Sequence, residues 1–527
     1  MSNSDLSWTD RVDGAVNDVF EPVSSFLSDV VFVTVPIFGA DFPVIVAWLA
    51  LAGLVFTIYF GFAQVRYIKR SVQLVSGGYD QKDAPGEVSH FQALTSAMSG
   101  TIGLGNIAGV AIAVAVGGPG ATFWMIVCGL LGMASKFVEC TLGVKYREFN
   151  PDGTVNGGPM LYLRKGLAEL GWPRVGKVLA WGSAVMILFF ALFGGNLFQI
   201  NQSLEQMVAV TGGSDSFFSS SAGAILFGSV AAALVALVLI GGMKSIGAVT
   251  SKLVPGMGIM YVLACLMVIA FNLPAVPGAI EQIITGAFSP EGVAGGVLGA
   301  LIAGFRRAAF SNEAGVGSAP IAHSAVRTKR PATEGLVAMI EPFVDTVIVC
   351  TMTALTIIIA AGPVYEQARE TVAGGEEVGG TGFGITITSD AFDTALPWFP
   401  YLLTVAVILF AFSTLITWGY YGMKSWGYIF GHSKTSEMIY KVVFCGTVII
   451  GCLLSLGVLV DLADAALFLA AFFNIIGLFV LAPIVKKELA KVLEWMRRRD
   501  AGETDEEIEA DEAARGDGPE PVDASAR

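Results

Sequence analysis

Charged side chains are scarce in this chain, and so are the residues from which most metal sites are built. Only 14% of its 527 residues are Asp, Glu, Lys or Arg, and there are three histidines and six cysteines. No two cysteines have the Cys-x-x-Cys spacing, which argues against a zinc site and a disulfide framework. Nucleophile motifs and phosphate-binding loops are also missing from the sequence. We therefore expect neither an enzyme nor a bound cofactor, and no nucleic-acid partner.

Apolar residues dominate the composition instead. They make up 54% of the chain, and the mean hydropathy is +0.68. These values are typical of an all-α polytopic membrane protein. The 63 glycines suit the close packing of membrane helices. We predict a multi-pass protein of the cell (plasma) membrane, in contact with the lipid bilayer; the sequence leaves the oligomeric state open and is compatible with a monomer.

The formal net charge is −13, and much of the acid lies between residues 500 and 523. Two explanations remain open. A high-salt cytoplasm favours acidic, well-solvated surfaces, and an ordinary disordered acidic tail has the same composition. We predict residues 486–527 as a cytoplasmic acidic tail without stable structure.

Eleven apolar segments are long enough to cross a bilayer. A preceding polar segment, residues 1–41, has the amphipathic pattern of a helix lying on the membrane surface. The predicted spans lie at about 42–62, 91–116, 121–144, 178–208, 222–241, 253–271, 292–321, 336–361, 397–426, 439–460 and 465–485.

The loops between these segments alternate in charge. Basic residues follow every odd-numbered span, from Arg66, Lys69 and Arg70 after the first to Arg497, Arg498 and Arg499 after the last. The opposite loops are acidic or neutral. Because basic loops face the cytoplasm, this alternation predicts an N-terminus outside the cell and a cytoplasmic C-terminus.

The second predicted span contains a sequence that a membrane helix does not ordinarily carry. Ser99 is followed by Gly100-Thr101-Ile102 and then by Gly103-Leu104-Gly105-Asn106. Glycine allows the backbone to leave the helix, which exposes N–H and C=O groups. Such groups survive at membrane depth only inside protein or beside a water-filled cavity. We predict a broken helix whose ends hold a small solute and a cation.

The seventh predicted span has a similar interruption at residues 310–320. Its Gly315-Val316-Gly317-Ser318 resembles Gly103-Leu104-Gly105-Asn106, and Phe343-Val344-Asp345 in the next span resembles Phe137-Val138-Glu139. The matches fall at corresponding places in two five-span halves, residues 91–272 and 291–485. Five crossings separate the halves, so they form an inverted repeat, the pattern of many transporters. Glycine packing without a ligand is the alternative.

Several longer motifs resemble the alanine or glycine:cation symporter family. They are the stretches at 103–110, 117–125, 132–139, 157–160 and 310–320, together with Ser413-Thr414 and residues 418–422. The resemblance covers residues 91–483. It implies a LeuT-type fold of ten core helices in a 5+5 inverted repeat, with one extra N-terminal transmembrane helix at 42–62. The sequence departs from the family pattern at Leu104, where threonine is expected, and at Ala308, where glycine is expected.

The substrate that the resemblance implies, alanine or glycine, is a small zwitterion. The N–H groups of Leu104 and Gly105, next to Gly103, suit a carboxylate at a half-helix N-terminus. Free carbonyls around Phe310 and Ser311 suit the ammonium group. The resemblance also implies a side-chain pocket on two helices, lined by Phe193, Asn196, Thr414 and Trp418. Core packing of the aromatic rings and an interhelical hydrogen bond from Asn196 are the alternatives.

Sodium prefers oxygen ligands. The hydroxyls of Ser413 and Thr414, with the carbonyls of Ser99 and Ile102, are the predicted sodium site. Asn106 either serves a second site or caps the break. Six ionisable residues lie in or near spans, and we favour structural or gating roles for them: Lys136, Glu139, Arg307, Glu313, Glu341 and Asp345.

The resulting hypothesis is sodium-coupled symport of alanine or glycine into the cell by alternating access. The main alternative is a proton-coupled carrier of another small metabolite, which would need one of the buried acids to titrate. A channel fits less well, because two offset helix breaks suit an enclosed site better than a continuous pore.

Overall fold

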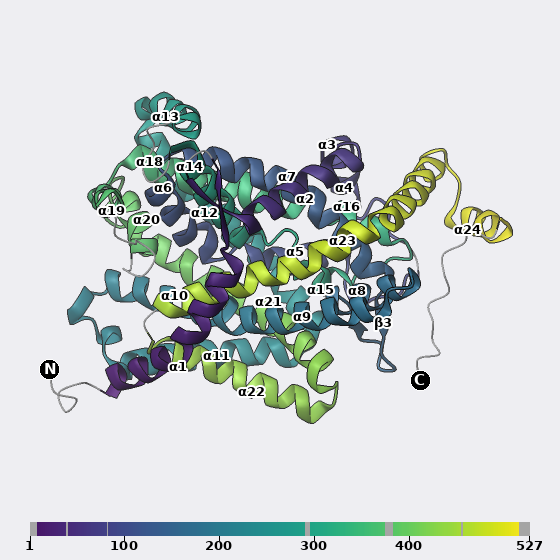
Figure 1. Ribbon diagram of the computed structural model, residues 1–527, viewed down its shortest axis with the longest axis horizontal. Helices are drawn as coiled ribbons and strands as arrows, with labels where there is room; N and C mark the ends of the chain where they lie inside the picture. Colours follow the sequence, from purple (N-terminus) through teal and green to yellow (C-terminus); the bar gives the residue numbers. More distant parts are fainter. Residues whose placement is uncertain are drawn as a thin grey trace.

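The computed structural model describes residues 8–37, 40–81, 83–289, 296–374, 383–454 and 457–515. Within these ranges the chain is almost entirely helical, with two short antiparallel hairpins. Long helices run side by side through the molecule, and shorter ones gather at its two ends (Figure 1). The first residues of the predicted second half, 291–295, and the last residues of the tail, 516–527, lie outside the described residues.

Three elements precede the helical bundle. Helix α1 (Trp8–Val31) is followed by a hairpin of β1 (Thr34–Ile37) and β2 (Ala40–Pro43), and then by the apolar helix α2 (Val44–Tyr59). Helix α1 packs against the last long helix, where the rings of Phe32 and Phe468 lie 5.5 Å apart. Helix α2 lies within the predicted first span, and its 16 residues make it shorter than the spans that follow.

Seven helices in the described part of the chain are long and apolar enough to cross a membrane. An eighth is formed by α5 (His90–Thr101) and the segment Leu104–Gly117, which meet at a bend of 58°. The protein is therefore a polytopic membrane protein, as its composition predicts. The seven are α7 (Gly120–Lys145), α9 with α10 (Pro173–Leu192, Phe198–Val210), α11 (Ser221–Ile240), α12 (Gly242–Phe271), the run from α16 to α18 (Pro331–Ala338, Ile340–Pro342, Thr351–Ala360), α21 (Phe399–Phe430) and α23 (Gly457–Asp500).

The remaining predicted spans correspond to shorter or more polar helices, so the count of eleven stays a prediction. They are α2, the pair α14 (Gly296–Asn312) and α15 (Ala319–His323), and α22 (Lys434–Gly451). Several boundaries differ from the sequence-based expectation, because helices continue beyond the apolar run that crosses the bilayer: α12 begins at Gly242 instead of about 253, and α23 continues to Asp500 instead of about 485. The span predicted at 439–460 ends at Gly451, and residues from Gly457 onward already belong to α23.

Short elements cap both ends of the bundle. At one end lie α13 (Val276–Phe288), α19 (Pro363–Ala373) and α20 (Phe383–Asp393); at the other lie α3 (Ala63–Arg66), α4 (Ile68–Val75), α8 (Pro159–Glu169) and the hairpin of β3 (Glu148–Phe149) and β4 (Val155–Asn156) (Figure 1). The π-helical segment η6 (Phe343–Cys350) joins α17 to α18, and the short turns η3 (Gly213–Asp215), η4 (Phe217–Ser219) and η5 (Leu273–Ala275) lie in connecting loops.

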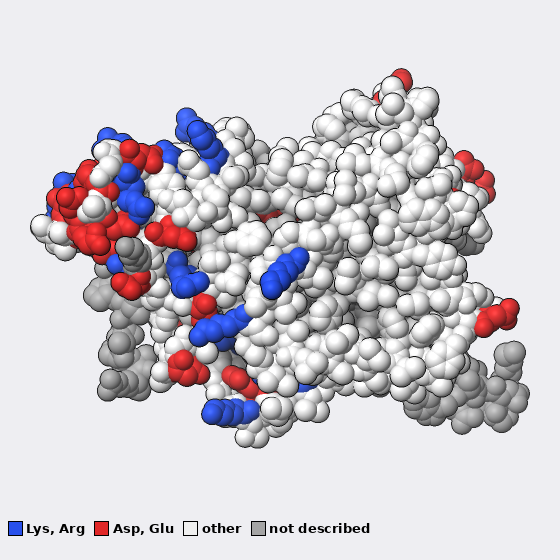
Figure 2. Space-filling view, turned by 180° about the vertical axis from the view of Figure 1, so that it is seen from behind, with Lys and Arg blue, Asp and Glu red and all other residues white. Residues whose placement is uncertain are grey.

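Charged side chains are concentrated at the end that carries α24 (Asp505–Ala514), and a broad band of the surface has very few (Figure 2). Large apolar side chains are exposed on the helices, for example Leu237 at 72% and Ile240 at 63%. Exposed apolar surface of this extent is unfavourable in water and favourable in lipid. The distribution supports a bundle that lies in a bilayer.

The acidic tail is more ordered than its composition predicts. Helix α23 continues to Asp500, and α24 follows, capped by Thr504. Glu509 forms an ion pair with Lys329 at 2.8 Å, and Glu512 with Arg330 at 2.9 Å. The expectation of an unstructured tail from residue 486 treated these acids as solvated charges, because their basic partners are far away in the sequence.

Candidate functional site

The first helix break is held open by side chains that bind its free N–H groups. Helix α5 ends at Thr101, Gly103 is extended, and the chain resumes with the short turn η1 (Leu104–Asn106) and α6 (Ala108–Gly117). The Gly103 N–H donates to Asn106 Oδ1 at 2.9 Å, and the Leu104 N–H donates to Gln199 Oε1 at 3.1 Å. Within the described chain, the N–H of Gly105 has no acceptor. One backbone donor at the break therefore remains available.

Glycine at position 103 is required by a close approach of α21. A Cβ atom there would lie 2.6 Å from Thr414 Oγ1 and 3.2 Å from Gln199 Oε1. At Gly105 the nearest atom would be Phe310 Cδ1, at 3.4 Å. The two glycines thus bring the first break against α21 on one side and against α14 on the other.

The second break follows α14 and faces the first. Glu313 has a left-handed backbone (φ 53°), as do Gly315 and Gly317 (both φ 89°), before α15 begins. A Cβ on Gly105 would lie 3.5 Å from the Cα of Ser311, in the last turn of α14. The sequence-predicted residues Gly103, Gly105, Phe310 and Ser311 are therefore brought together.

Aromatic rings close around the two breaks. Phe190 contacts Phe310 and Trp418, with ring centroids 5.6 and 4.5 Å away, and Phe198 contacts Phe310 at 5.8 Å. The indole N–H of Trp418 donates to Glu313 Oε1 at 3.2 Å. The structure thus places Trp418 beside the second break, together with Phe190 and Phe198, which were not predicted.

The structure does not bring the predicted Asn196 to the breaks. Its Nδ2 donates to the Phe444 carbonyl at 2.9 Å and to Thr447 Oγ1 at 2.8 Å, both on α22. Phe193 stacks on Phe189 at 5.9 Å. Both residues lie in the π-helical turn η2 (Phe193–Leu197), whose wider hydrogen-bonding pattern rotates side chains relative to an α-helix. The α-helical spacing that would place Phe193 and Asn196 on one helix face therefore does not hold in this turn.

Oxygen atoms from α5 and α21 converge beside the first break. The Ser99 carbonyl accepts hydrogen bonds from Thr414 Oγ1 at 3.1 Å and from Ser413 Oγ at 3.4 Å. Ser99 Oγ in turn donates to the Ser413 carbonyl at 2.6 Å. Ile102 is buried at the end of α5, where its backbone leaves the helical conformation (ψ 84°). Hydroxyl and carbonyl oxygens are the ligands that a hard cation such as sodium prefers.

A buried carboxylate links both breaks. Asp345 Oδ1 accepts from Asn106 Nδ2 at 2.6 Å, and Oδ2 accepts from Ser311 Oγ at 2.9 Å and Thr346 Oγ1 at 2.7 Å. Asn106 therefore caps the first break and also contacts Asp345. The sequence placed Asp345 among structural or gating residues; its correspondence with Glu139 was the signal that pointed to this position.

A second buried ionic network lies between α7 and the run from α16 to α18. Lys136 Nζ lies 3.0 Å from Glu341 Oε1 and 4.0 Å from Glu139 Oε1. Glu139 Oε2 accepts from the Gly317 N–H at 3.1 Å, so the network reaches the second break. The predicted Lys136–Glu139 pair is present, but Glu341 is the closer partner.

The histidines add to this network at helix ends. His90, at the start of α5, and His323, at the end of α15, both contact Glu334. His432 lies just beyond α21. Among the described residues, no group of three or more His, Cys, Asp or Glu side chains is arranged to hold a metal ion. All six cysteines are free.

The site is enclosed. Leu104, Asn106 and Trp418 are fully buried, and Phe310 is 5% exposed. The arrangement offers one backbone N–H, a cluster of hydroxyl and carbonyl oxygens, one carboxylate and an aromatic wall. Such a set can bind a small zwitterion together with a cation.

Comparison with known proteins shows similarity to sodium-coupled amino-acid symporters. The profile of the Sodium:alanine symporter family matches residues 26–509. The chain is 35% identical over 460 residues to the "Sodium/alanine symporter AgcS" of Methanococcus maripaludis, covering 87% of this chain and 96% of that protein. It is 34% identical over 437 residues to the "Amino-acid carrier protein AlsT" of Bacillus subtilis, covering 82% and 86%.

A solved structure shows the same fold at low sequence identity. The crystal structure of MhsT in complex with L-phenylalanine, a LeuT-fold transporter, superposes with a TM-score of 0.52 at 14% identity. The match covers 76% of this chain and 98% of that one.

Proposed function

This chain belongs to the Sodium:alanine symporter family, and from that membership we propose that it carries alanine or glycine into the cell together with sodium. The observation that carries the proposal is the meeting of the two helix breaks: a Cβ on Gly105 would lie 3.5 Å from the Cα of Ser311, and the Gly105 N–H has no acceptor among the described residues. A half-helix N-terminus attracts a carboxylate, and free carbonyls attract an ammonium group.

The substrate carboxylate binds the Gly105 N–H in this proposal. The Leu104 N–H takes part only if Gln199 moves away, because Gln199 Oε1 already accepts from it. The ammonium group binds the backbone carbonyls of Phe310 and Ser311. The substrate side chain contacts Leu104, Phe190, Phe310 and Trp418 in this proposal, and the bulk of these residues favours hydrogen or methyl over larger groups.

Sodium binds in two places in this proposal. The first uses the oxygens of Ser99, Ile102, Ser413 and Thr414, and it bridges α5 and α21. The second uses the carboxylate of Asp345 with the hydroxyl oxygen of Ser311, and Asn106, whose Nδ2 donates to Asp345, holds that carboxylate in place. A buried carboxylate is costly unless a cation or hydrogen-bond donors compensate it. Sodium at either place stabilises the broken conformation before the amino acid binds.

Transport then follows from the repeat. We infer eleven spans, an inverted 5+5 core, an extracellular N-terminus and a cytoplasmic C-terminus from the loop charges. The core exposes the breaks first to one side and then to the other. Between these two states the proposed cycle passes through an intermediate in which the breaks are closed to both sides.

Uptake into proteoliposomes tests the substrate assignment. An inward sodium gradient is applied, and labelled alanine, glycine, glutamine and phenylalanine are compared. The proposal expects alanine or glycine to accumulate fastest and phenylalanine not to accumulate. Faster uptake of glutamine or phenylalanine than of alanine and glycine would contradict the small apolar pocket.

A further inference from the structure

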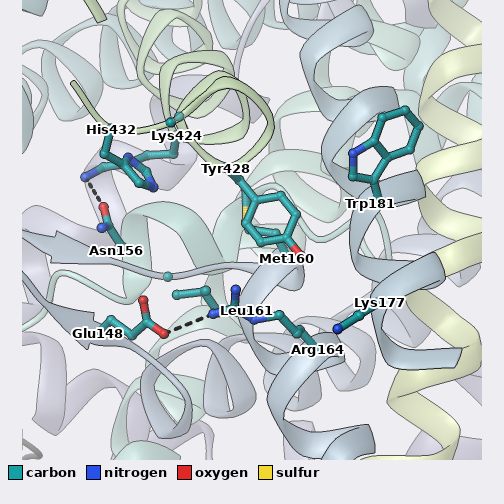
Figure 3. Close-up of a pocket in the computed structure, with 13 residues that line it drawn as sticks. Glu148, Asn156, Met160, Leu161, Arg164, Lys177, Trp181, Lys424, Tyr428 and His432 are labelled. Carbon is teal, nitrogen blue, oxygen red and sulfur yellow. Dashed lines mark hydrogen bonds and ion pairs between the residues drawn. The ribbon is translucent and has the colours of Figure 1, made fainter. Parts of the chain in front are cut away.

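A cavity lies at the end of the bundle that carries the basic loops. Its volume is about 510 Å³. It is formed by the β3–β4 hairpin, α8, the beginning of α9 and the end of α21 (Figure 3). The substrate and sodium sites proposed above use none of these residues.

Basic side chains from three helices line this cavity. They are Arg164 on α8, Lys177 on α9 and Lys424 on α21. Among the lining residues, all within the described chain, Glu148 is the single carboxylate. Arg164 Nη2 lies 3.1 Å from Glu148 Oε1, and Lys165 shares the same oxygen at 2.9 Å. The lining side chains therefore carry three cations against one carboxylate. Acidic residues outside the lining, Glu87, Asp152 and Glu437, also act on Lys424.

The basic side chains that line the cavity differ in the number of hydrogen-bond and ion-pair partners that they already have. Lys424 Nζ donates to the Val155 carbonyl at 2.9 Å and to Asn156 Oδ1 at 2.8 Å. Lys177, by contrast, has no hydrogen-bond or ion-pair partner among the described residues. His432 lies at the rim, and burial together with the charge of Lys424 lowers its pKa. Lys177 is exposed, so its ammonium group can meet an anion that enters the cavity without first breaking a contact.

The cavity borders the lipid-facing surface. Trp181 lines it and is 57% exposed, and further exposed apolar residues precede it: Trp172, directly before α9, and Val175 and Val178 on α9. Trp181 and Lys177 are four residues apart on α9, so they share one face of the helix. Tryptophan at the edge of an apolar band is typical of the boundary between headgroups and acyl chains.

We propose that this cavity binds the phosphate of an anionic phospholipid headgroup. Arg164 can offer two parallel N–H groups to phosphate oxygens, and Lys177 supplies a point charge. The acyl chains then lie along the exposed apolar residues of α9. Free phosphate shares the headgroup's chemistry but would gain nothing from those apolar residues, so the lipid is the favoured source. Basic pockets between membrane helices are known to hold such headgroups.

Native mass spectrometry of the full-length protein tests the site, with phosphatidylglycerol compared with phosphatidylcholine as the added lipid. We expect selective retention of phosphatidylglycerol. The double substitution Arg164→Gln with Lys177→Gln should weaken that retention by about tenfold or more. Lys487→Gln, on an exposed lysine of α23 outside the cavity, is the matched control and should leave it within about twofold. Glu148→Gln should strengthen retention, since it removes the carboxylate that competes for Arg164.

Adding inorganic phosphate distinguishes the two sources of the anion. Persistence of the bound lipid in excess phosphate supports the headgroup, and displacement of the lipid supports a phosphate site that free phosphate also enters. Equal retention of the two lipids, or unchanged retention in the double variant that remains folded, would overturn the proposal. None of these readouts depends on which amino acid is transported.

Discussion

Asn106 donates a hydrogen bond of 2.6 Å to the carboxylate of Asp345. The same asparagine accepts from the Gly103 N–H, so one side chain connects the first helix break to the helix that follows the second. Any change in the charge of Asp345 is therefore transmitted directly to the break. This relationship makes Asp345 the first residue to test.

Replacing the Asp345 carboxylate should weaken sodium binding. Asp345→Asn retains the shape of the side chain but removes its charge, and we expect the sodium concentration for half-maximal alanine uptake to rise about tenfold, which corresponds to about 1.4 kcal/mol. Asp215→Asn, in the exposed turn η3, is the control and should behave as wild type. An unchanged sodium dependence in Asp345→Asn would remove this residue from the sodium site.

Adding a methyl group at the first break should disturb the contact with α21. The Cβ of Gly103→Ala would meet Thr414 Oγ1 at 2.6 Å, and such overpacking costs roughly 1–3 kcal/mol. The rate of alanine uptake and the midpoint temperature of thermal unfolding should both decrease. Gly109→Ala is the matched control, because a Cβ there meets no atom within 4 Å. Equal behaviour of the two variants would show that the close approach is not important.

The aromatic wall should set the size of the substrate. Phe190→Leu removes ring volume between Phe310 and Trp418, so we expect leucine and methionine to compete with labelled alanine more strongly than in wild type. Phe189→Leu changes a neighbouring ring that stacks on Phe193 instead and serves as the control. The same competition profile in both variants would contradict the assignment of Phe190 to the pocket.

His432 should make the protein less stable in mild acid. Burial and Lys424 lower its pKa below the ordinary value of 6.5. The unfolded chain therefore binds more protons than the folded one near that pH, and stability falls as the pH drops through about 6.5. Thermal melts of His432→Gln between pH 5 and 8 should show a smaller acid loss than wild type. A variant with the same acid loss would show that other groups cause it.

The contacts of the tail predict how firmly α24 is held. Glu509 and Glu512 bind Lys329 and Arg330, and Ile508 is fully buried. Glu509→Gln combined with Glu512→Gln should speed hydrogen exchange in α24 by about tenfold. Glu506→Gln, on an exposed glutamate of the same helix, is the control. High salt should reproduce part of the effect in wild type, because it screens partly exposed ion pairs.

Hydropathy and glycine placement predict the architecture well. The long apolar runs became helices at the expected places, and the bend at Gly103 lies where the glycines interrupt the second span. These features depend on local sequence, since a membrane helix must satisfy its backbone within a short segment.

The side chains that contact the two helix breaks could not be predicted from local sequence. Gln199 accepts a hydrogen bond from the Leu104 N–H, and the ring of Phe190 contacts Trp418. The residues of each pair are far apart in the sequence, so a local sequence pattern does not predict these contacts. The π-helical turn at Phe193–Leu197 also changed which face of the helix meets the breaks. The resemblance to a family predicted Phe193 and Asn196 from their positions in the sequence. The π-helical turn rotates the helix there, so other side chains, such as Phe190, lie beside the breaks.

Sodium bound at the first break should drive alanine uptake. The initial rate of uptake into proteoliposomes, with an inward sodium gradient or with choline at fixed pH, measures this coupling. We predict rapid accumulation with sodium and none with choline. Thr414→Val, which removes one hydroxyl near the Ser99 carbonyl, should need more sodium for the same rate. Uptake that is indifferent to sodium, or that follows an imposed proton gradient instead, would contradict the account.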